Sequence, residues 1–330
     1  MNLAILPDCR AETAPHAAAV ADDNIDLDNT GFLAAVRRAT TSLRAAGVST
    51  GDVVAIMLPN TASFVVAVFA TWRLGATVTA IDPALSAEDA GYRMARTDTE
   101  VLISRYEPPG GFPVRSVVAA DSLTSAEPDA AAPARADDDT PALVLHTGGA
   151  AGTSEVVTLD HMHLNAVCRL AIEIFDLTAT DHSLSILPLF HVNGIALGTV
   201  SPLLAGGRAT LGPFVPATFF DRVERSRATY FSAVPDMYTQ LSDLPAEAQP
   251  NTSSVRITIC GAAQPSVQLR TEFERRYDIP IIHDHGLTEF PARTRSIRPP
   301  ASPRQAPSKH SRPAADSGPA FRRTAPNKQV

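Results

Sequence analysis

Lysine is nearly absent from this 330-residue chain. Only Lys309 and Lys328 occur, and both belong to the last forty residues. Arginine is not an equivalent group, because its planar guanidinium keeps its proton under all ordinary conditions. The first 290 residues therefore exclude any mechanism that needs a lysine side chain.

Cysteine is also scarce, since Cys9, Cys168 and Cys260 are far apart and form no C-x-x-C pair. An odd, dispersed set excludes a disulfide framework and a cysteine zinc site, and it is typical of a reducing cytoplasm. The start of the chain lacks the basic and apolar regions of a signal peptide. The longest apolar stretch, residues 64–81, contains an arginine and a glycine, so it predicts a helix and a strand rather than a membrane span. We expect a cytoplasmic protein.

Charge is unevenly distributed along the sequence. Residues 291–330 hold seven Arg, two Lys and one acidic residue, a net charge of +8, whereas residues 1–290 carry a net charge of −15. An acidic body argues against nucleic acid as a partner, because phosphate backbones select basic surfaces. The tail has few large apolar residues, so we expect it to be disordered. A basic-tail interaction protein stays open as an alternative.

Residues 30–106 alternate between helical and strand patterns. Thr30 is expected to cap a first helix, and Ser86 with Asp89 resembles a capping box for a later helix. Short apolar runs between the helices indicate buried strands. The expected strands are 53–58, 76–81 and 101–104, and a further helix is expected over 63–74.

The alternation resumes after residue 141. Strands are expected at 143–145, 183–187, 255–259 and 280–283, and helices at 160–175 (capped by Asp160), 195–204, 217–225 and 266–276. Helices between short apolar strands predict an α/β fold of mostly parallel sheets covered by helices. The expected divisions are a first α/β lobe over 1–124, an Ala/Pro/Asp-rich linker over 125–140, a second α/β lobe over 141–290, and the basic tail over 291–330.

A loop of small residues, T-G-G-A-A-G-T-S-E, occupies residues 147–155 directly after an expected strand. Small residues let backbone N–H groups approach phosphate closely, so the loop is a candidate anion cradle. Taken alone, the same pattern fits a flexible turn.

The segment L-P-L-F-H-V-N-G, residues 187–194, follows another expected strand. A proline and an aromatic–histidine pair before a helix can place His191 at the mouth of a pocket. In isolation, a buried core histidine is the commoner interpretation.

Two further segments follow strands near the end of the body. C-G-A-A occupies residues 260–263, and H-G-L-T-E occupies residues 285–289. Ligands of open α/β sheets bind beyond the carboxyl ends of the strands. Thr288 can donate to a phosphate oxygen, and Glu289 can hold a magnesium ion.

In this order and spacing, these segments resemble the adenylate-forming superfamily, and the acyl-CoA synthetase branch fits best. The family's phosphate loop Y-T-S-G-T-T-G-x-P-K-G corresponds to residues 146–156, its L-P-x-F-H-x-x-G to 187–194, its G-A-A-P to 261–264 and its Y-G-L-T-E to 285–289. The resemblance implies the α/β lobes of that family's large domain, without the small C-terminal domain.

The resemblance further implies an ATP-dependent ligase. A carboxylic (fatty) acid attacks the α-phosphate of ATP to give an acyl-AMP, and the thiol of coenzyme A then displaces AMP. Implied cofactors are ATP/AMP, Mg²⁺ and coenzyme A. The implied contacts are Thr147, Gly149, Gly152 and Thr153 with the β- and γ-phosphates, Gly261, Ala262 and Ala263 with adenine, Gly286 with the nucleotide, and His191 with the acyl chain. The implied catalytic residues are Thr288, which contacts the AMP phosphate, and Glu289, which holds Mg²⁺.

Several positions depart from the family pattern. Ala150 and Ala151 replace two loop threonines, Glu155 replaces the loop lysine, and Asp284 replaces a glycine. Two unit charges ~4 Å apart interact by about 4 kcal/mol at an effective dielectric constant of ~20, so a reversed charge beside a triphosphate is costly. No T-G-D segment or catalytic lysine follows Glu289. We expect a truncated or frameshifted form with little activity alone; a non-catalytic nucleotide- or acyl-binding remnant, and half of a split ligase completed by a separate chain, stay open.

Overall fold

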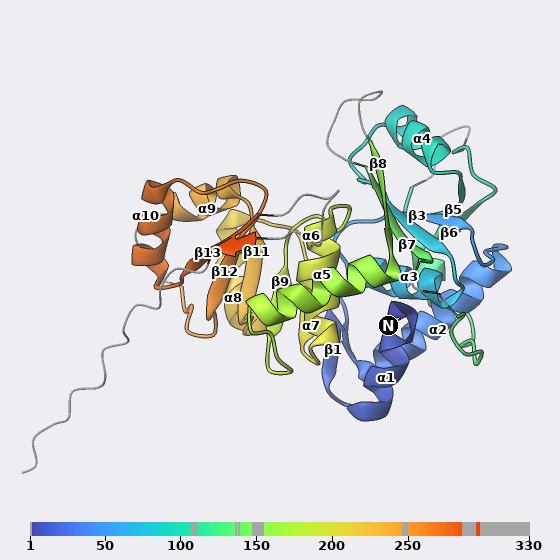
Figure 1. Ribbon diagram of the computed structural model, residues 1–330, viewed down its shortest axis with the longest axis horizontal. Coiled ribbons are helices and arrows are strands. Elements are labelled where there is room, and N and C mark those ends of the chain that lie inside the picture. Colours follow the sequence, from blue (N-terminus) through green and yellow to red (C-terminus); the bar gives the residue numbers. More distant parts are fainter. Residues whose placement is uncertain are drawn as a thin grey trace, which may run out of the picture. The chain divides into compact units, whose positions relative to one another are not determined.

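The computed structural model describes residues 2–106, 111–135, 137, 139–146, 155–245, 250–285 and 295–297, with the side chains of 284, 285 and 295–297 left undescribed. These residues form two mostly parallel β-sheets with helices packed against them (Figure 1). The predicted α/β class is therefore confirmed. The two sheets are described in turn, because the residues at their carboxyl edges matter most for function.

The first sheet has six strands in the order β6-β5-β3-β4-β7-β8. All neighbours are parallel except β7 and β8, which are antiparallel. Central strands β3 and β4 are almost wholly buried, as expected for apolar strands covered on both faces. Its strands are β3 (Val53–Met57), β4 (Thr77–Ala80), β5 (Thr99–Ser104), β6 (Ser116–Ala119), β7 (Pro141–His146) and β8 (Val156–Asp160).

The second sheet has eight strands in the order β14-β13-β12-β11-β9-β10-β1-β2. Only the outermost pair at each edge is antiparallel. Its strands are β1 (Ala18–Ala21), β2 (Asp26–Asp28), β9 (His182–Ser185), β10 (Arg208–Leu211), β11 (Tyr230–Ala233), β12 (Ile257–Cys260), β13 (Ile281–His285) and β14 (Arg295–Ile297).

Each sheet draws strands from both sides of residues 125–140, where the sequence predicted a linker between lobes. Strands β7 and β8 complete the first sheet, whereas β1 and β2 complete the second. The intervening segment packs on helices: the carboxylate of Asp129 pairs with Arg44 at 2.7 Å, and Arg73 donates to the carbonyl of Ala131 at 2.7 Å. The lobes expected from the sequence therefore do not coincide with the two sheets, because strands that are far apart in the sequence pair with one another.

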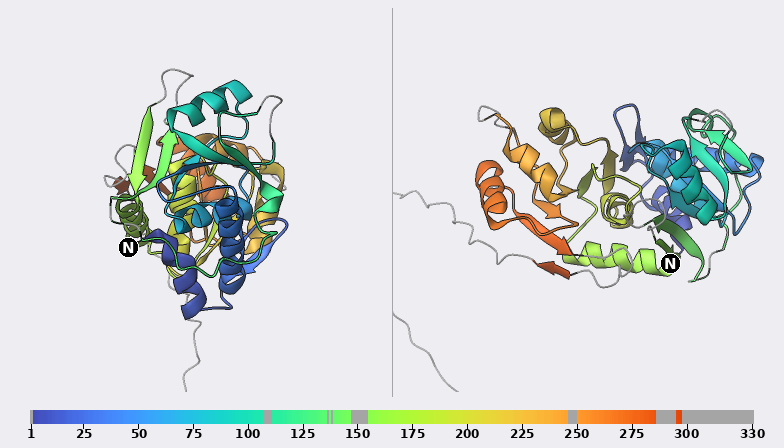
Figure 2. Two further views of the ribbon diagram at one scale, coloured as in Figure 1. Left: turned by 90° about the vertical axis from the view of Figure 1, so that its right-hand side faces the viewer. Right: turned by 90° about the horizontal axis from the view of Figure 1, so that it is seen from above.

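Helices and short helical turns connect the strands. They are η1 (Leu3–Ile5), α1 (Leu6–Thr13), α2 (Asn29–Ala45), α3 (Ala62–Arg73), α4 (Ala87–Arg96), η2 (Ala120–Ser122), α5 (His161–Ile174), α6 (Val192–Ile195), the π-helical turn η3 (Ala196–Val200), α7 (Ser201–Leu204), α8 (Pro216–Ser226), α9 (Pro235–Ser242) and α10 (Val267–Tyr277). Two further views show how they cover the sheets (Figure 2).

The predicted helix caps are largely confirmed. The Ser86 hydroxyl accepts from the Asp89 N–H at 3.1 Å and donates to its carboxylate, and Asp160 caps α5. The prediction for Thr30 is wrong. Asp28 caps α2 instead, because its carboxylate reaches the N–H of Gly31 at 2.7 Å, whereas the Thr30 hydroxyl donates to the Pro15 carbonyl.

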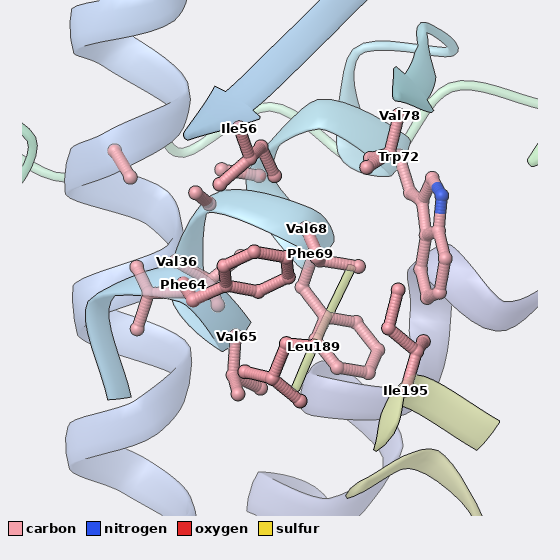
Figure 3. Packing of buried hydrophobic residues seen from close by; sticks show 14 of the residues in the cluster. Val36, Ile56, Phe64, Val65, Val68, Phe69, Trp72, Val78, Leu189 and Ile195 are labelled. Carbon is pink, nitrogen blue, oxygen red and sulfur yellow. The ribbon is translucent and has the colours of Figure 1, made fainter. Parts of the chain in front are cut away.

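Helix α3 lies at the centre of the largest hydrophobic cluster. It is buried along nearly its whole length, as expected for a helix that is apolar all round. Figure 3 shows Phe64 and Phe69 of α3 beside Leu189 and Ile195, which flank His191 in the sequence. The segment that carries His191 therefore rests on the core.

Candidate active site

The carboxyl ends of β9, β11 and β12 lie at one edge of the second sheet, because these strands are parallel neighbours. Gly261 directly follows β12, and its N–H donates to the carbonyl of Ala233, the last residue of β11, at 3.0 Å. This edge is where open α/β sheets bind ligands. Two of the sequence-predicted site segments, 187–194 and 260–263, leave the sheet here.

The G-A-A segment forms a tight turn. The Ala263 N–H donates to the Gly261 carbonyl at 2.8 Å, and Ala262 takes a left-handed backbone conformation with φ of 64°. Gly261 is buried, whereas the methyl groups of Ala262 and Ala263 are exposed. Small exposed side chains leave this edge open to a flat group.

The thiol next to this turn is inert. Cys260 is fully buried, and burial raises its pKa to about 12. A thiol with such a pKa stays protonated at neutral pH and is a poor nucleophile. The turn can therefore contribute shape and backbone groups, and the cysteine adds no covalent chemistry.

Asn60, which follows β3, fixes the position of the segment that carries His191. Its side-chain amide donates to the Leu187 carbonyl at 2.7 Å, and its side-chain oxygen accepts from the Leu189 N–H at 3.0 Å. Gly194 allows the next turn to close, because a Cβ there would stand 2.3 Å from the carbonyl oxygen of Pro188. Asn60 therefore fixes the start of this loop, and the close turn at Gly194 fixes its end.

His191 lies at the surface beside the Phe190 ring, with 4.7 Å between ring centroids. Desolvation lowers its pKa below 6.5, the charge of Asp82 raises it, and Arg93 lowers it. The imidazole is therefore mainly neutral at pH 7 and is available as a hydrogen-bonding group rather than a cation.

Asn193 joins the two segments. Its side-chain nitrogen lies 3.0 Å from the position that a Cβ on Gly261 would occupy. The structure therefore brings the His191 loop and the G-A-A turn into contact, although some 70 residues separate them in the sequence. Any side chain larger than hydrogen at position 261 would push Asn193 away.

The helix after His191 differs from the regular helix expected over 195–204. Its central turn, η3, is π-helical, and two side-chain hydroxyls, one from η3 itself and one from β11, donate to carbonyls of this helix. Tyr230 donates to the Leu197 carbonyl at 3.0 Å, and Thr199 donates to the Gly194 carbonyl at 3.1 Å. Gly198 permits the close packing on β9, since a Cβ there would meet the Ser185 hydroxyl at 2.5 Å.

The remaining predicted site residues lie outside the described residues and stay predictions. These are Thr147, Gly149, Gly152, Thr153, Gly286, Thr288 and Glu289. Strands β7 and β8 flank the segment that holds Thr147 to Thr153, and β13 ends directly before Gly286. Among the described residues, no group of three or more His, Cys, Asp or Glu side chains could hold a metal ion. Nor does any helix in the described ranges have the length and apolar character needed to cross a membrane.

Comparison with known proteins decides the family. The model of the AMP-binding enzyme family matches residues 8–317 of this chain. The chain belongs to the AMP-binding enzymes. In this AMP-binding enzyme, the G-A-A turn and the His191 loop lie at the carboxyl edge of the second sheet.

Curated relatives of this AMP-binding enzyme are CoA ligases. An oxalate–CoA ligase of Arabidopsis thaliana is 29% identical over 283 residues, which cover 77% of this chain and 54% of that protein. A feruloyl-CoA synthase of an Amycolatopsis species is 29% identical over 292 residues, covering 85% and 58%. The chain thus spans a little over half the length of these relatives.

Solved structures share the fold of this AMP-binding enzyme. The N-terminal domain of FACL13 from Mycobacterium tuberculosis superposes with a TM-score of 0.80 at 22% identity, over 88% of this chain and 77% of that chain. The anthranilate CoA ligase AuaEII gives a TM-score of 0.81 at 18% identity, over 88% and 60%. The fold is therefore that of the large N-terminal domain of adenylate-forming enzymes.

Sequence reasoning missed Asn60 and Asn193. Asn60 belongs to L-P-N-T, residues 58–61, directly after a buried strand, and a polar side chain at that place is a usable signal. Asn193 lies inside a segment that the sequence singled out for its histidine alone. Both asparagines act across long sequence separations, which no local pattern encodes.

Replacing Asn60 by alanine is expected to lower the free energy of unfolding by about 2 to 4 kcal/mol. The change leaves the Leu187 carbonyl and the Leu189 N–H without partners, and each unpaired buried group costs about 1 to 3 kcal/mol. Urea denaturation measures the loss. Asn24→Ala, at an exposed position, is the matched control, and an equal effect of both substitutions would contradict the role of Asn60.

Proposed function

We propose that this chain binds ATP and a carboxylic acid and catalyses, weakly on its own, the adenylation step of an acid–thiol (acyl-CoA) ligase. The observation that carries the proposal is the contact between Asn193, in the His191 loop, and Gly261 of the G-A-A turn. A nucleotide against the turn and an acid beside His191 lie at one edge of one sheet. Adjacent binding of the two reactants is the main requirement of a bimolecular adenylation.

In this proposal the roles follow the sequence motifs. Gly261, Ala262 and Ala263 contact adenine, and His191 contacts the acyl substrate as a neutral hydrogen-bonding group. The phosphates and Mg²⁺ are assigned to Thr147, Gly149, Gly152, Thr153, Gly286, Thr288 and Glu289. When bound, ATP supplies the activated α-phosphate and the pyrophosphate leaving group. Coenzyme A is the proposed acceptor of the acyl group.

In this proposal, the altered residues of the phosphate loop weaken adenylation. Two loop threonines are replaced by Ala150 and Ala151, and Glu155 at the end of the loop carries a negative charge where the family has lysine. An exposed carboxylate near the triphosphate opposes binding, and solvent reduces the size of that effect. We therefore propose weak adenylation by this chain alone, with a lysine supplied by a separate chain as the route to full activity.

Carboxylate-dependent exchange of labelled pyrophosphate into ATP tests the proposal. A panel of aliphatic, aromatic and dicarboxylic acids covers the substrate classes, and Glu155→Lys is expected to raise the exchange rate at limiting ATP at least tenfold. Glu224→Lys makes the same charge change at an exposed position on α8 and serves as the control. Tight AMP binding without exchange, in both the natural chain and Glu155→Lys, would favour the non-catalytic alternative.

A further inference from the structure

Helix α3 begins without a cap from its own sequence. Thr61 holds the N-cap position, but its side chain accepts no capping hydrogen bond from the described residues of the helix, and its hydroxyl donates to the Pro59 carbonyl at 3.3 Å. The first backbone N–H groups of a helix have no partner inside the helix. One of them belongs to the fully buried Ala62 and needs an acceptor, because an unpaired buried N–H is costly.

Asp22, at the turn between β1 and β2, supplies that acceptor from 40 residues away. Its Oδ2 atom accepts from the Ala62 N–H at 2.9 Å. Its Oδ1 atom accepts from the N–H groups of Asn24 and Ile25 at 2.8 Å and 3.0 Å, which fixes the carboxylate within its own turn. A negative charge at the start of a helix also interacts favourably with the helix dipole. Asp22 therefore caps α3 from another part of the chain.

The start of α3 also supports the His191 loop. Asn60 precedes the helix by two residues and holds the loop through its hydrogen bonds with the Leu187 carbonyl and the Leu189 N–H. Val65, in the first turn of α3, lies beside Leu189 in the same hydrophobic cluster (Figure 3). A displacement of this turn therefore moves both the polar and the apolar support of the loop.

The G-A-A turn has a different support. Gly261 follows β12, and its N–H donates to the carbonyl of Ala233 at the end of β11. These two strands are parallel neighbours within the second sheet, whereas Asp22 acts through α3. Loss of Asp22 is therefore expected to disturb the His191 loop more than the G-A-A turn.

We propose that Asp22 is a positioning residue for the carboxylic acid substrate, because it fixes the start of α3 and, through Asn60, the loop that carries His191. The inference rests on the proposed function for the assignment of the acid to that loop. In this role Asp22 does not itself contact the acid. Its removal weakens binding of the acid and leaves binding of ATP nearly unchanged.

Three variants of the whole 330-residue chain test this role. Asp22→Ala removes the cap. The double variant Asp22→Ala/Thr61→Asp restores a capping carboxylate within the helix's own sequence, because aspartate is among the preferred N-cap residues. Asp26→Ala is the matched control, since it removes a carboxylate of the same hairpin that pairs with Arg208 at 3.3 Å rather than with α3. Thermal midpoints and near-ultraviolet circular dichroism define a temperature at which all variants are folded.

Hydrogen exchange followed by mass spectrometry measures the loop without any ligand. Peptides spanning residues 186–195 include the Leu189 N–H, which donates to Asn60, and peptides spanning 257–264 report on the G-A-A turn. Asp22→Ala is expected to speed hydrogen exchange in 186–195 about fivefold, the size of a lost helix cap, and to leave 257–264 unchanged. The double variant is expected to return to the rate of the natural chain, and Asp26→Ala to match that rate throughout.

Pyrophosphate exchange separates the two substrates. Decanoate, benzoate and succinate represent the aliphatic, aromatic and dicarboxylic classes, and the acid that supports the reaction is varied at saturating ATP, and ATP at saturating acid. Asp22→Ala is expected to raise the KM for the acid about fivefold and to leave the KM for ATP nearly unchanged. A loss of stability alone, at a temperature where the variants are folded, would not raise one KM and spare the other.

Two results would overturn the proposal. One is hydrogen exchange of 186–195 in Asp22→Ala that matches the natural chain or that rises equally in 257–264. The other is an equal rise, or no rise, of the two KM values. Faster hydrogen exchange confined to 186–195, in a chain that incorporates no pyrophosphate, supports the control of the loop by Asp22 and contradicts only the proposed function. Pyrophosphate incorporation with kinetics that do not depend on Asp22 does the reverse.

Discussion

Acidification from pH 7 to pH 4 is expected to lower the free energy of unfolding by several kcal/mol. His146, His161 and His182 are buried, and burial lowers the pKa of each from 6.5 to about 4. The unfolded chain binds protons at these positions below pH 6.5, whereas the folded chain does so only near pH 4. Stability is therefore fully present above pH 6.5 and falls as the pH drops toward 4.

The size of this effect follows from the pKa differences. One pKa unit corresponds to about 1.4 kcal/mol, so each histidine contributes up to about 3 kcal/mol at pH 4. Urea denaturation at intervals between pH 7 and pH 5 measures the slope. His161→Phe is expected to reduce the slope by about one proton, because phenylalanine keeps the edge-on ring contact with Trp72 and cannot titrate.

A substitution at an exposed residue that does not titrate supplies the control for the acid effect. Asn24→Ala is expected to leave the slope unchanged, since it neither adds nor removes a titrating group. The same pH dependence in His161→Phe and in the natural chain would show that buried histidines are not its cause.

Replacing Arg10 by methionine is expected to lower the free energy of unfolding by about 3 to 5 kcal/mol, because each hydrogen bond from a charged donor contributes about 1.5 to 3 kcal/mol. Arg10 is 5% exposed and connects α1 to α2, to α7 and to the turn before β10: it donates to the side chain of Asn29 at 2.7 Å, to the Leu203 carbonyl and to the Gly207 carbonyl at 2.8 Å. Burial lowers its pKa to about 10, so it remains charged at pH 7. Its loss removes the donor to the side-chain oxygen of Asn29 and to the Gly207 carbonyl.

Chemical denaturation of Arg10→Met beside Arg275→Met tests this expectation. Arg275 is exposed on α10, so Arg275→Met removes the same charge without disturbing buried packing. A loss below about 1 kcal/mol for Arg10→Met would contradict the view that the N-terminal helix is fixed by this buried guanidinium.

Local features of the fold were predictable from the sequence. The caps at Ser86 and Asp160 depend on residues three positions apart, and the buried strands depend on short apolar runs. The cap of α2 was misassigned because Asp28 and Thr30 both fit the pattern, and only the tertiary contact of Thr30 with Pro15 distinguishes them.

Long-range pairing was beyond the sequence pattern. Strand β1 joins the second sheet by pairing with β10, nearly 190 residues away, and β7 joins the first sheet across the expected linker. The irregular turn η3 also escaped prediction, because the hydroxyl of Tyr230 that holds it comes from a distant strand. These contacts depend on which buried faces of the chain meet, and the hydrophobic periodicity of a single sequence does not encode them.

The candidate site likewise combines local motifs, which the sequence shows, with long-range contacts, which it does not. The motifs identified His191 and the G-A-A turn, because their residue types and order are distinctive even in a single sequence. The contact that unites them depends on Asn193, and the position of the loop depends on Asn60. The segments that carry the candidate residues were therefore recognisable from the sequence, and the residues that position these segments were not.

Binding of AMP to the whole chain, compared between the natural protein and Gly261→Val, tests the account most directly. A Cβ at 261 stands 3.0 Å from the flexible end of the Asn193 side chain, so valine alters the contact between the G-A-A turn and the His191 loop. Thr271→Val, exposed on α10, is the control. The account predicts saturable binding that Gly261→Val weakens at least tenfold, about 1.4 kcal/mol. Equal affinity of the natural chain and Gly261→Val, or no binding by either, would contradict it.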